Sequence, residues 1–244
     1  MNGVLAVLKR ELRSYFVTPL AYVFIVIFLV FANALTFYLG NFYDRGQADL
    51  ASFFTFHPWL YLFLVPALSM RLWAEERKSG SIELLMTLPI EPWQAVLGKY
   101  FAAWIFTALA VALTFPIWIT VNYLGHPDNG AILAAYLGSI LMAGGFLAVG
   151  SCISATTKNQ VIAFILSVGA CLILLLAGYS LVLNAFSSWA PQALVDAVAS
   201  LSFLTHFNDI SRGVIDLRDL VYFALLIGVC LYANTIVLAL KKAE

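Results

Sequence analysis

The sequence predicts an all-α integral membrane protein with six transmembrane helices. Three observations predict this fold class: 63% of the 244 residues are hydrophobic, only 11% are charged, and the mean hydropathy is +0.94. Soluble domains contain roughly 45–50% apolar and about 25% charged residues, so this composition excludes an ordinary water-soluble globule. The 13 basic and 13 acidic side chains cancel, which excludes a nucleic-acid binder that neutralises phosphates with a basic surface.

Six apolar segments are long enough to cross a membrane. A helix that crosses a hydrocarbon core of about 30 Å needs roughly 20 apolar residues. The segments are 20–39, 52–70, 100–123, 132–155, 161–183 and 220–240. The second segment is the least regular, because His57 and Pro58 interrupt its start. Pro66 and Pro116 predict kinks inside the second and third spans.

Residues 1–18 predict an amphipathic helix that lies in the membrane interface. Leu5, Leu8, Leu12 and Tyr15 share one helical face, and Lys9, Arg10 and Arg13 share the other. We expect the apolar face in lipid and the cations among anionic headgroups. The dipeptide Thr18-Pro19 ends this helix and starts the first span.

Basic residues near the span ends predict the orientation, since Lys and Arg favour the cytoplasmic side. With the N-terminus inside, ten of the 13 basic residues fall on the cytoplasmic side, and only Arg45, Arg212 and Arg218 fall on the other. We therefore expect both termini in the cytoplasm.

The centres of the predicted spans contain small residues and no charged side chains. No Asp, Glu, Lys or Arg lies in the central part of any span, although ion-coupled transporters normally need such groups. The histidines lie at or outside the span ends without ligand spacing, and we expect no catalytic, cofactor-binding or metal-binding residue. In the fourth span, Gly144, Ala148 and Cys152 recur every four residues. Such a stripe favours close helix packing, within the bundle rather than at a dimer seam.

The loop 71–99 is the most informative segment. A charged helix extends from the second span and ends at Ser79-Gly80, where glycine permits a left-handed C-cap. A second helix starts near Ser81, and Pro89 limits it to about two turns. A helix of this length is unstable alone, so we expect it to dock on another molecule. A loop that packs on itself and orders the second and third spans is the alternative.

The connection 184–219 predicts short helices on the external side. Pro191 can open one helix, and Ser202 can cap another that continues to Gly213. Phe203, Phe207 and Ile210 share an apolar face of that helix. We expect Asp209 and Arg212 to pair across one turn, a contact worth a few tenths of a kcal/mol.

The loop 71–99 resembles the signature loop of the integral-membrane subunits of ABC-2 type transporters. That family has a Glu-x-x-x-Gly-Thr-x-Glu pattern, then a Leu-Pro pair and a Gly-Lys pair. The matching residues here are Glu76, Gly80, Ser81 and Glu83, followed by Leu88-Pro89 and Gly98-Lys99. Ser81 replaces the usual threonine and keeps its hydroxyl. His206-Phe207 and residues 212–219 are most similar to the gliding-motility-associated branch.

The resemblance implies a single ABC-2 transmembrane domain over residues 1–244, in a bacterial cytoplasmic (inner) membrane. The segment 80–88 is then the coupling helix, which sits in a groove of a separate cytoplasmic ATPase subunit. The expected contact residues are Glu75, Glu76, Arg77, Gly80, Ser81, Glu83, Leu84, Leu85 and Leu88. His206, Phe207, Asp209 and Arg212 are expected in short external re-entrant helices that cap the translocation path.

The resemblance also implies a complex. Two ATPase copies, which bind ATP and Mg²⁺, serve a dimer of identical or different permease chains in the lipid bilayer, with a periplasmic or envelope partner as a further candidate. The chain itself is not an enzyme, and export of an unidentified substrate or mechanical work both stay open. The alternative is an ATP-independent membrane channel or scaffold subunit, which predicts that residues 75–83 tolerate rewriting when their charge is kept.

Overall fold

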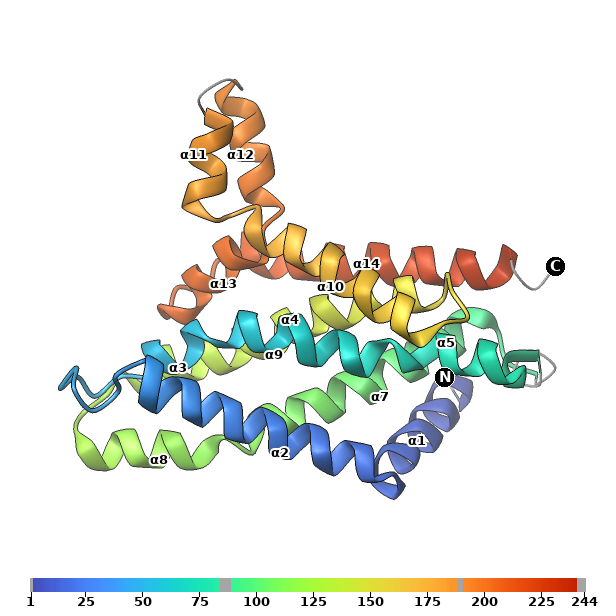
Figure 1. Ribbon diagram of the computed structural model, residues 1–244, viewed down its shortest axis with the longest axis horizontal. Helices are drawn as coiled ribbons and strands as arrows, with labels where there is room; N and C mark the ends of the chain where they lie inside the picture. Colours follow the sequence, from blue (N-terminus) through green and yellow to red (C-terminus); the bar gives the residue numbers. More distant parts are fainter. Residues whose placement is uncertain (1, 84–88, 188–190, 241–244) are drawn as a thin grey trace.

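The computed structural model describes residues 2–83, 89–187 and 191–240, and every regular element in these ranges is a helix (Figure 1). This confirms the all-α class. Four helical segments in these ranges are long and apolar enough to cross a membrane: Ala21–Leu39, Pro92–Leu124, Asn129–Ser154 and Leu217–Leu240. Leu84, Leu85 and Leu88 of the predicted coupling helix lie outside the described residues.

The chain begins with two helices that meet at the predicted boundary. Helix α1 covers Asn2–Val17, and α2 covers Pro19–Ala34 and continues as the π-helix η1, Leu35–Leu39. Pro19 occupies the first turn of α2, where its missing N–H costs no hydrogen bond. Tyr15, on the predicted apolar face of α1, is partly buried, and its ring stacks on Phe106 with a centroid distance of 5.2 Å.

The second predicted span, 52–70, is divided between two helices, and a third helix follows it at the start of the loop 71–99. These are α3 (Ala51–Thr55), α4 (His57–Ser69) and α5 (Arg71–Ser79). Helix α4 continues through Pro66 and ends at Ser69. Met70, between α4 and α5, keeps helical dihedral angles of φ −56° and ψ −27°. His57, which we expected at a span end, is instead fully buried and bonds Ser139 at 2.9 Å.

The third predicted span begins earlier than expected and breaks where expected. Helix α7 covers Pro92–Ala112, and it starts at Pro92 because Glu91 and Gln94 form a capping box. Helix α8 covers Phe115–Leu124. The break lies at residues 113–114, and Pro116, in the first turn of α8, has no N–H to continue the α7 hydrogen-bond ladder.

Helix α9 (Asn129–Ser154) is the centre of the bundle. It packs against α4 and α7, and against α10 (Gln160–Leu176), α13 (Phe203–Ser211) and α14 (Leu217–Leu240). Its small residues serve this packing: a Cβ atom on Gly144 would lie 2.9 Å from the Tyr100 hydroxyl and the Trp104 indole nitrogen. The small-residue stripe therefore packs inside the chain, as the sequence favoured.

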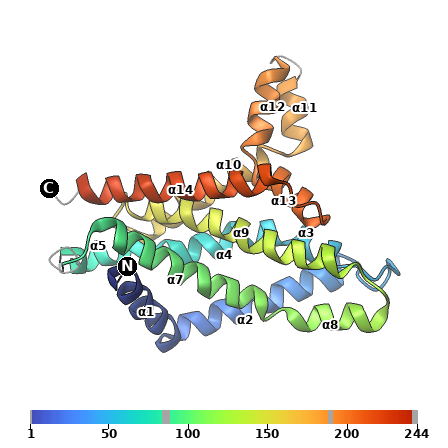
Figure 2. The ribbon, with the colours of Figure 1, turned by 180° about the vertical axis from the view of Figure 1, so that it is seen from behind.

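The chain leaves the bundle after α10. Helix α10 ends at Leu176, short of the predicted limit of the fifth span. Helices α11 (Ser180–Ser187) and α12 (Gln192–Ser200) form a hairpin that projects sideways from the bundle (Figures 1 and 2). Ser202 then caps α13 by accepting a hydrogen bond from Leu204 N at 3.1 Å, which confirms the predicted cap.

Candidate functional site

Polar side chains gather at the end of the bundle where α1, α5, α7 and α9 meet. We call this region the α5 junction, and it comprises Arg10, Glu11, Trp73, Glu76, Arg77, Lys99, Ser151 and Ser154. It contains Glu76 and Arg77, two of the residues predicted to contact an ATPase subunit. Trp73 belongs to the same helix, α5, and the other members come from helices distant in the sequence.

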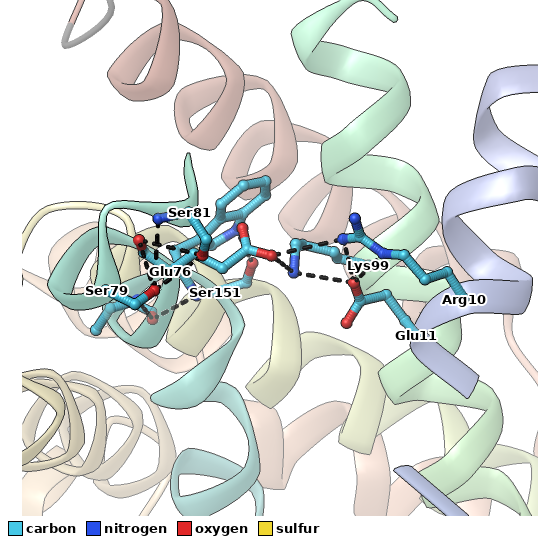
Figure 3. A network of polar contacts seen from close by, with 10 residues as sticks. Arg10, Glu11, Glu76, Ser79, Ser81, Lys99 and Ser151 are labelled. Carbon is cyan, nitrogen blue, oxygen red and sulfur yellow. Dashed lines mark hydrogen bonds and ion pairs between the residues drawn. The ribbon is translucent and has the colours of Figure 1, made fainter. Parts of the chain in front are cut away.

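A lysine at the centre of the α5 junction joins three helices (Figure 3). Lys99 of α7 is only 3% exposed, and its Nζ lies 2.8 Å from Glu76 Oε1 of α5 and 3.2 Å from Glu11 Oε1 of α1. Arg10 Nη2 lies 2.6 Å from the same Glu11 oxygen and 3.5 Å from Glu76 Oε1. A buried ammonium group is tolerated only with such carboxylate partners. The Lys99 ammonium therefore ties α1 and α5 to α7.

The charge of Glu11 reflects this surrounding. Burial is the largest influence and raises the pKa of the Glu11 carboxyl, but the Lys99 ammonium and the Arg10 guanidinium lower it by more in sum. The pKa therefore falls below its ordinary value of 4.5. Glu11 is a carboxylate at neutral pH and holds α1 against α7 by charge.

The glycine next to Lys99 allows α1 to approach. A Cβ atom on Gly98 would lie 2.7 Å from Val7 Cβ and 3.0 Å from the Val4 carbonyl oxygen. Real Cβ atoms do not tolerate the first of these distances, so only glycine lets the two helices pack this closely. The Gly98-Lys99 pair thus has two structural roles: Gly98 leaves room for α1 to pack closely, and Lys99 binds Glu11 of α1.

Helix α5 receives its N-terminal cap from a different helix. Its own N-cap residue, Met70, provides no side-chain cap. Instead Ser154 Oγ, at the end of α9, accepts hydrogen bonds from Trp73 N at 3.2 Å and Ala74 N at 3.1 Å. The same hydroxyl donates to the Met70 carbonyl at 2.8 Å. First-turn N–H groups have no partner within their own helix, so Ser154 does for α5 what a Ser or Asp at the N-cap position usually does.

Two further contacts fix α5 to the bundle. The Trp73 indole Nε1 donates to Ser151 Oγ at 3.2 Å, and Asn234 Nδ2 of α14 donates to the same oxygen at 2.8 Å. Arg77 Nη1 donates to the Ala155 carbonyl at 2.5 Å, which satisfies a carbonyl at the C-terminal end of α9. The Lys99 ammonium also lies 5.3 Å from the Trp73 ring centroid. The Trp73 indole therefore contacts both the Ser151 hydroxyl and the Lys99 ammonium.

The other predicted coupling residues continue from this anchored helix. Glu75 pairs with Arg71 at 2.8 Å on the exposed face of α5. Gly80 has φ 74° and ends α5 in the left-handed conformation, which confirms the predicted C-cap. Residues 81–83 resume helical backbone, with Glu83 N donating to the Gly80 carbonyl at 3.2 Å. Ser81 Oγ lies 2.9 Å from Ser79 Oγ.

An open cleft of about 660 Å³ borders the α5 junction. Its wall carries three cations and three carboxylates, namely Arg10, Arg71, Lys99, Glu11, Glu75 and Glu76. Its apolar part includes Tyr15, Leu68 and Leu72. The Glu76 Oε2 atom is buried, and no group among the described residues donates a hydrogen bond to it.

The predicted external residues lie at the opposite end of the bundle. His206 Nδ1 lies 2.6 Å from Asp219 Oδ1, and His206 Nε2 lies 3.0 Å from the Ser200 carbonyl. Both ring nitrogens therefore lie within hydrogen-bond distance of oxygen atoms, so the imidazole ring is held from both sides. The ring stacks on Tyr222 at 4.0 Å. We call His206 and Asp219 the His206 pair.

The neighbours of His206 on α13 have different surroundings. Phe203, Phe207 and Ile210 are buried, which confirms the predicted apolar face. The expected ion pair between Asp209 and Arg212 is wrong: among the described residues, these side chains form no ion pair, and their contact is a backbone hydrogen bond from Arg212 N to Asp209 O at 3.2 Å.

Sequence reasoning missed Glu11, Trp73, Ser151, Ser154 and Asn234. Their partners lie on other helices, and no spacing within the sequence reveals contacts of that range. A weak signal existed in α1, where Glu11 is an acidic residue beside Arg10 in a segment otherwise read as basic.

Comparison with known families agrees with this architecture. Residues 43–236 match the family model described as ABC-2 family transporter protein. No curated protein is significantly similar to the chain. The match covers most of the chain, including α5, the Gly98-Lys99 pair and the external helices. The chain therefore belongs to the ABC-2 transporter family as a multi-pass membrane permease component.

Proposed function

We propose that the chain is the permease subunit of an ATP-driven ABC-2 complex. A separate cytoplasmic ATPase, in two copies, binds ATP and Mg²⁺, and its closure moves a dimer of permease chains to export a substrate or to do mechanical work. Family membership supports this proposal, since ABC-2 permeases normally work as dimers with an ATP-binding subunit. We propose an inner-membrane location with both termini in the cytoplasm, because most basic residues near the span ends fall on the side of the termini.

One observation carries the coupling role: α5 is attached to the bundle on two sides. Ser154 caps its first turn from α9, and Lys99 binds Glu76 from α7. A force applied to residues 80–88, directly after α5, would reach α9 through hydrogen bonds and α1 through Lys99 and Glu11. The proposed ATPase contact consists of Glu75, Glu76, Arg77, Gly80, Ser81, Glu83, Leu84, Leu85 and Leu88.

We propose that all six predicted spans cross the membrane within one domain, residues 1–244. Besides the four long segments, α10 has 17 residues and rises about 26 Å at 1.5 Å per residue. Helices α3 and α4 together extend from Ala51 to Ser69 with only Phe56 between them. Both lengths approach the hydrocarbon thickness of about 30 Å.

We further propose that α13 caps the translocation path from the external side. His206, Phe207, Asp209 and Arg212 belong to this segment, and the His206 pair fastens it to α14. Assignment to the gliding-motility-associated branch, and an envelope partner for the external helices, stay proposals that rest on the sequence resemblance.

Affinity purification in several mild detergents tests the proposal. The wild-type chain should recover a P-loop ATPase in a one-to-one ratio. Glu83→Lys should lose the ATPase, because it reverses a charge at the proposed contact. Asp44→Lys is the matched control, since it makes the same charge reversal at an exposed residue between η1 and α3 and should retain the ATPase.

Gly80→Pro provides the second test. Proline cannot adopt the φ of 74° found at this position, so the angle between α5 and the following helix should change. We expect ATP hydrolysis to continue without coupled movement of the permease. Recovery of the chain alone in every detergent would contradict the proposal and favour the channel or scaffold.

A further inference from the structure

The cleft beside the α5 junction combines an apolar part with an ionic wall. Its volume of about 660 Å³ lies within the range of pockets that bind small molecules, roughly 300–1,000 Å³. Tyr15, Leu68 and Leu72 provide apolar surface, and charged side chains of α1, α5 and α7 provide the rest. A ligand with one apolar and one polar part fits this lining better than a uniformly polar ligand does.

The cleft lies at a boundary of the membrane-spanning segments. Thr18, which lines it, directly precedes α2, and Leu68 belongs to the last turn of α4. Ser79 and Ser81, which also line it, follow at the far end of α5. The cleft therefore reaches from the end of two apolar helices into a charged region, the level at which phospholipid headgroups lie.

Two guanidinium groups on the cleft wall retain donors. Arg71 uses Nε and Nη2 on Glu75, and Arg10 uses Nε and Nη2 on Glu11. An arginine has five N–H donors in a planar fork, so within the described part of the chain the Nη1 group of each remains unused. Planar guanidinium groups bind phosphate well.

A carboxylate on the same wall lacks a donor. Glu76 Oε1 binds Lys99, but Oε2 is buried with no hydrogen-bond partner among the described residues. Buried polar atoms in proteins are nearly always bonded, so an orphan atom of this kind points to a missing ligand or water. The terminal torsion of Glu is soft, which lets this carboxylate turn toward the cleft. A primary ammonium group has three N–H donors to offer, whereas a quaternary ammonium has none.

We propose that this cleft binds a zwitterionic phospholipid with a primary-ammonium headgroup. The phosphate binds Arg71 and Arg10, the ammonium binds Glu76, and the acyl chains lie beside Leu68. Equal numbers of cations and carboxylates on the wall favour a headgroup without net charge. The inference needs a membrane-embedded chain and does not depend on the proposed ATPase.

Lipid retention tests this site. The full chain, with any subunits that accompany it, is placed in nanodiscs with equal amounts of phosphatidylethanolamine and phosphatidylcholine of identical acyl chains. After transfer to mild detergent, the retained lipids are counted by mass spectrometry. We expect about tenfold enrichment of phosphatidylethanolamine, the effect of one charge-assisted hydrogen bond, and a progressive fall with mono- and dimethylated headgroups.

Variants locate the effect. Glu76→Gln should abolish the enrichment, and Arg71→Ala should lower retention of both lipids. Arg71 is on the surface, so its variant stays informative if Glu76→Gln fails to fold. Arg13→Ala is the matched control, because Arg13 is exposed on α1 and does not line the cleft.

Two results would overturn the proposal. The first is failure of the expected lipid selection: equal retention of the two lipids by the wild-type chain, enrichment that survives in Glu76→Gln, or unchanged lipid retention in Arg71→Ala. The second is displacement of the lipid by soluble glycerophosphoethanolamine at micromolar concentration, which would identify a site for a soluble headgroup compound instead of a lipid.

Discussion

The α5 junction and the His206 pair occupy opposite ends of the bundle and bridge very different distances in the sequence. The α5 junction joins Glu11 to Lys99 and Trp73 to Ser154. His206 binds Asp219, only 13 residues further along the chain. Contacts between distant segments can pass a displacement from one helix to another, whereas the His206 pair holds one short helix on the span that follows it.

The two regions also differ in their exposure. Both side chains of the His206 pair are about 5% exposed or less. The carboxylates around Lys99 are 16% and 18% exposed and border an open cleft. The α5 junction is thus a partly hydrated ionic contact beside dry hydrogen bonds, and we expect its ionic part to rearrange more easily than the Ser154 cap.

Lys99→Met should have the largest effect on stability. It removes the buried cation from Glu11 and Glu76 and leaves them only the half-exposed Arg10 among the described residues, and removal of one partner from a buried ionic contact costs about 3–5 kcal/mol. We expect about 4 kcal/mol in the free energy of unfolding, measured by thermal unfolding in detergent. Lys158→Met, at an exposed position, should change the free energy of unfolding little. An equal loss of stability in both variants would show that Lys99 does not hold the three helices together.

His206→Phe should cost somewhat less, about 3 kcal/mol, because it leaves a single carboxylate, Asp219, without its partner. The double variant His206→Phe with Asp219→Leu should recover most of this loss, since replacing both partners of a buried hydrogen bond by apolar groups is often nearly neutral. Recovery is measured by the same unfolding experiment. Failure to recover would mean that the pair does more than hold α13 on α14.

Ser154→Ala should cost about 1–2 kcal/mol, the effect of losing an N-terminal cap. Hydrogen exchange should accelerate at the amides of Trp73 and Ala74, which lose their acceptor, and stay unchanged in α13. Ser154→Thr retains the hydroxyl and serves as the conservative control. Unchanged exchange at both amides in Ser154→Ala would show that the cap does not stabilise α5.

Acid should weaken the contact of α1 by the smallest amount, less than about 1 kcal/mol, because Glu11 is partly exposed. The pKa of Glu11 is lowered in the folded chain from 4.5, so the unfolded chain takes up the proton first. The stabilisation is complete above pH 4.5 and is lost as the pH falls through the lower folded pKa. Unfolding midpoints against pH should show this loss in the wild type and not in Glu11→Gln.

Local chemistry made part of this structure predictable. The helix ends at Thr18-Pro19, at Gly80 and at Ser202 depend on backbone preferences of single residues, and all three are confirmed. The break before Pro116 has the same origin. Signals of this kind act within one turn and can be read without knowledge of the tertiary structure.

Tertiary contacts were not predictable in the same way. Ser154 was one serine among several in an apolar helix, and its role depends on the position of α5 in space. The helical spacing placed Tyr15 on an apolar face, but it could not predict that its ring stacks on Phe106 of α7. Asp209 and Arg212 had suitable spacing for an ion pair, yet their side chains form no ion pair with each other in the described structure.

The cap that α9 supplies to α5 has a consequence for synthesis of the chain. Residues 71–79 leave the ribosome about 75 residues before Ser154, whose hydroxyl bonds the amides of Trp73 and Ala74. During that interval the first turn of α5 must bond to water or stay unwound. The segment that precedes the proposed coupling helix therefore reaches its folded form only after α9 has been synthesised, so a chain truncated before Ser154 would lack part of the proposed docking surface.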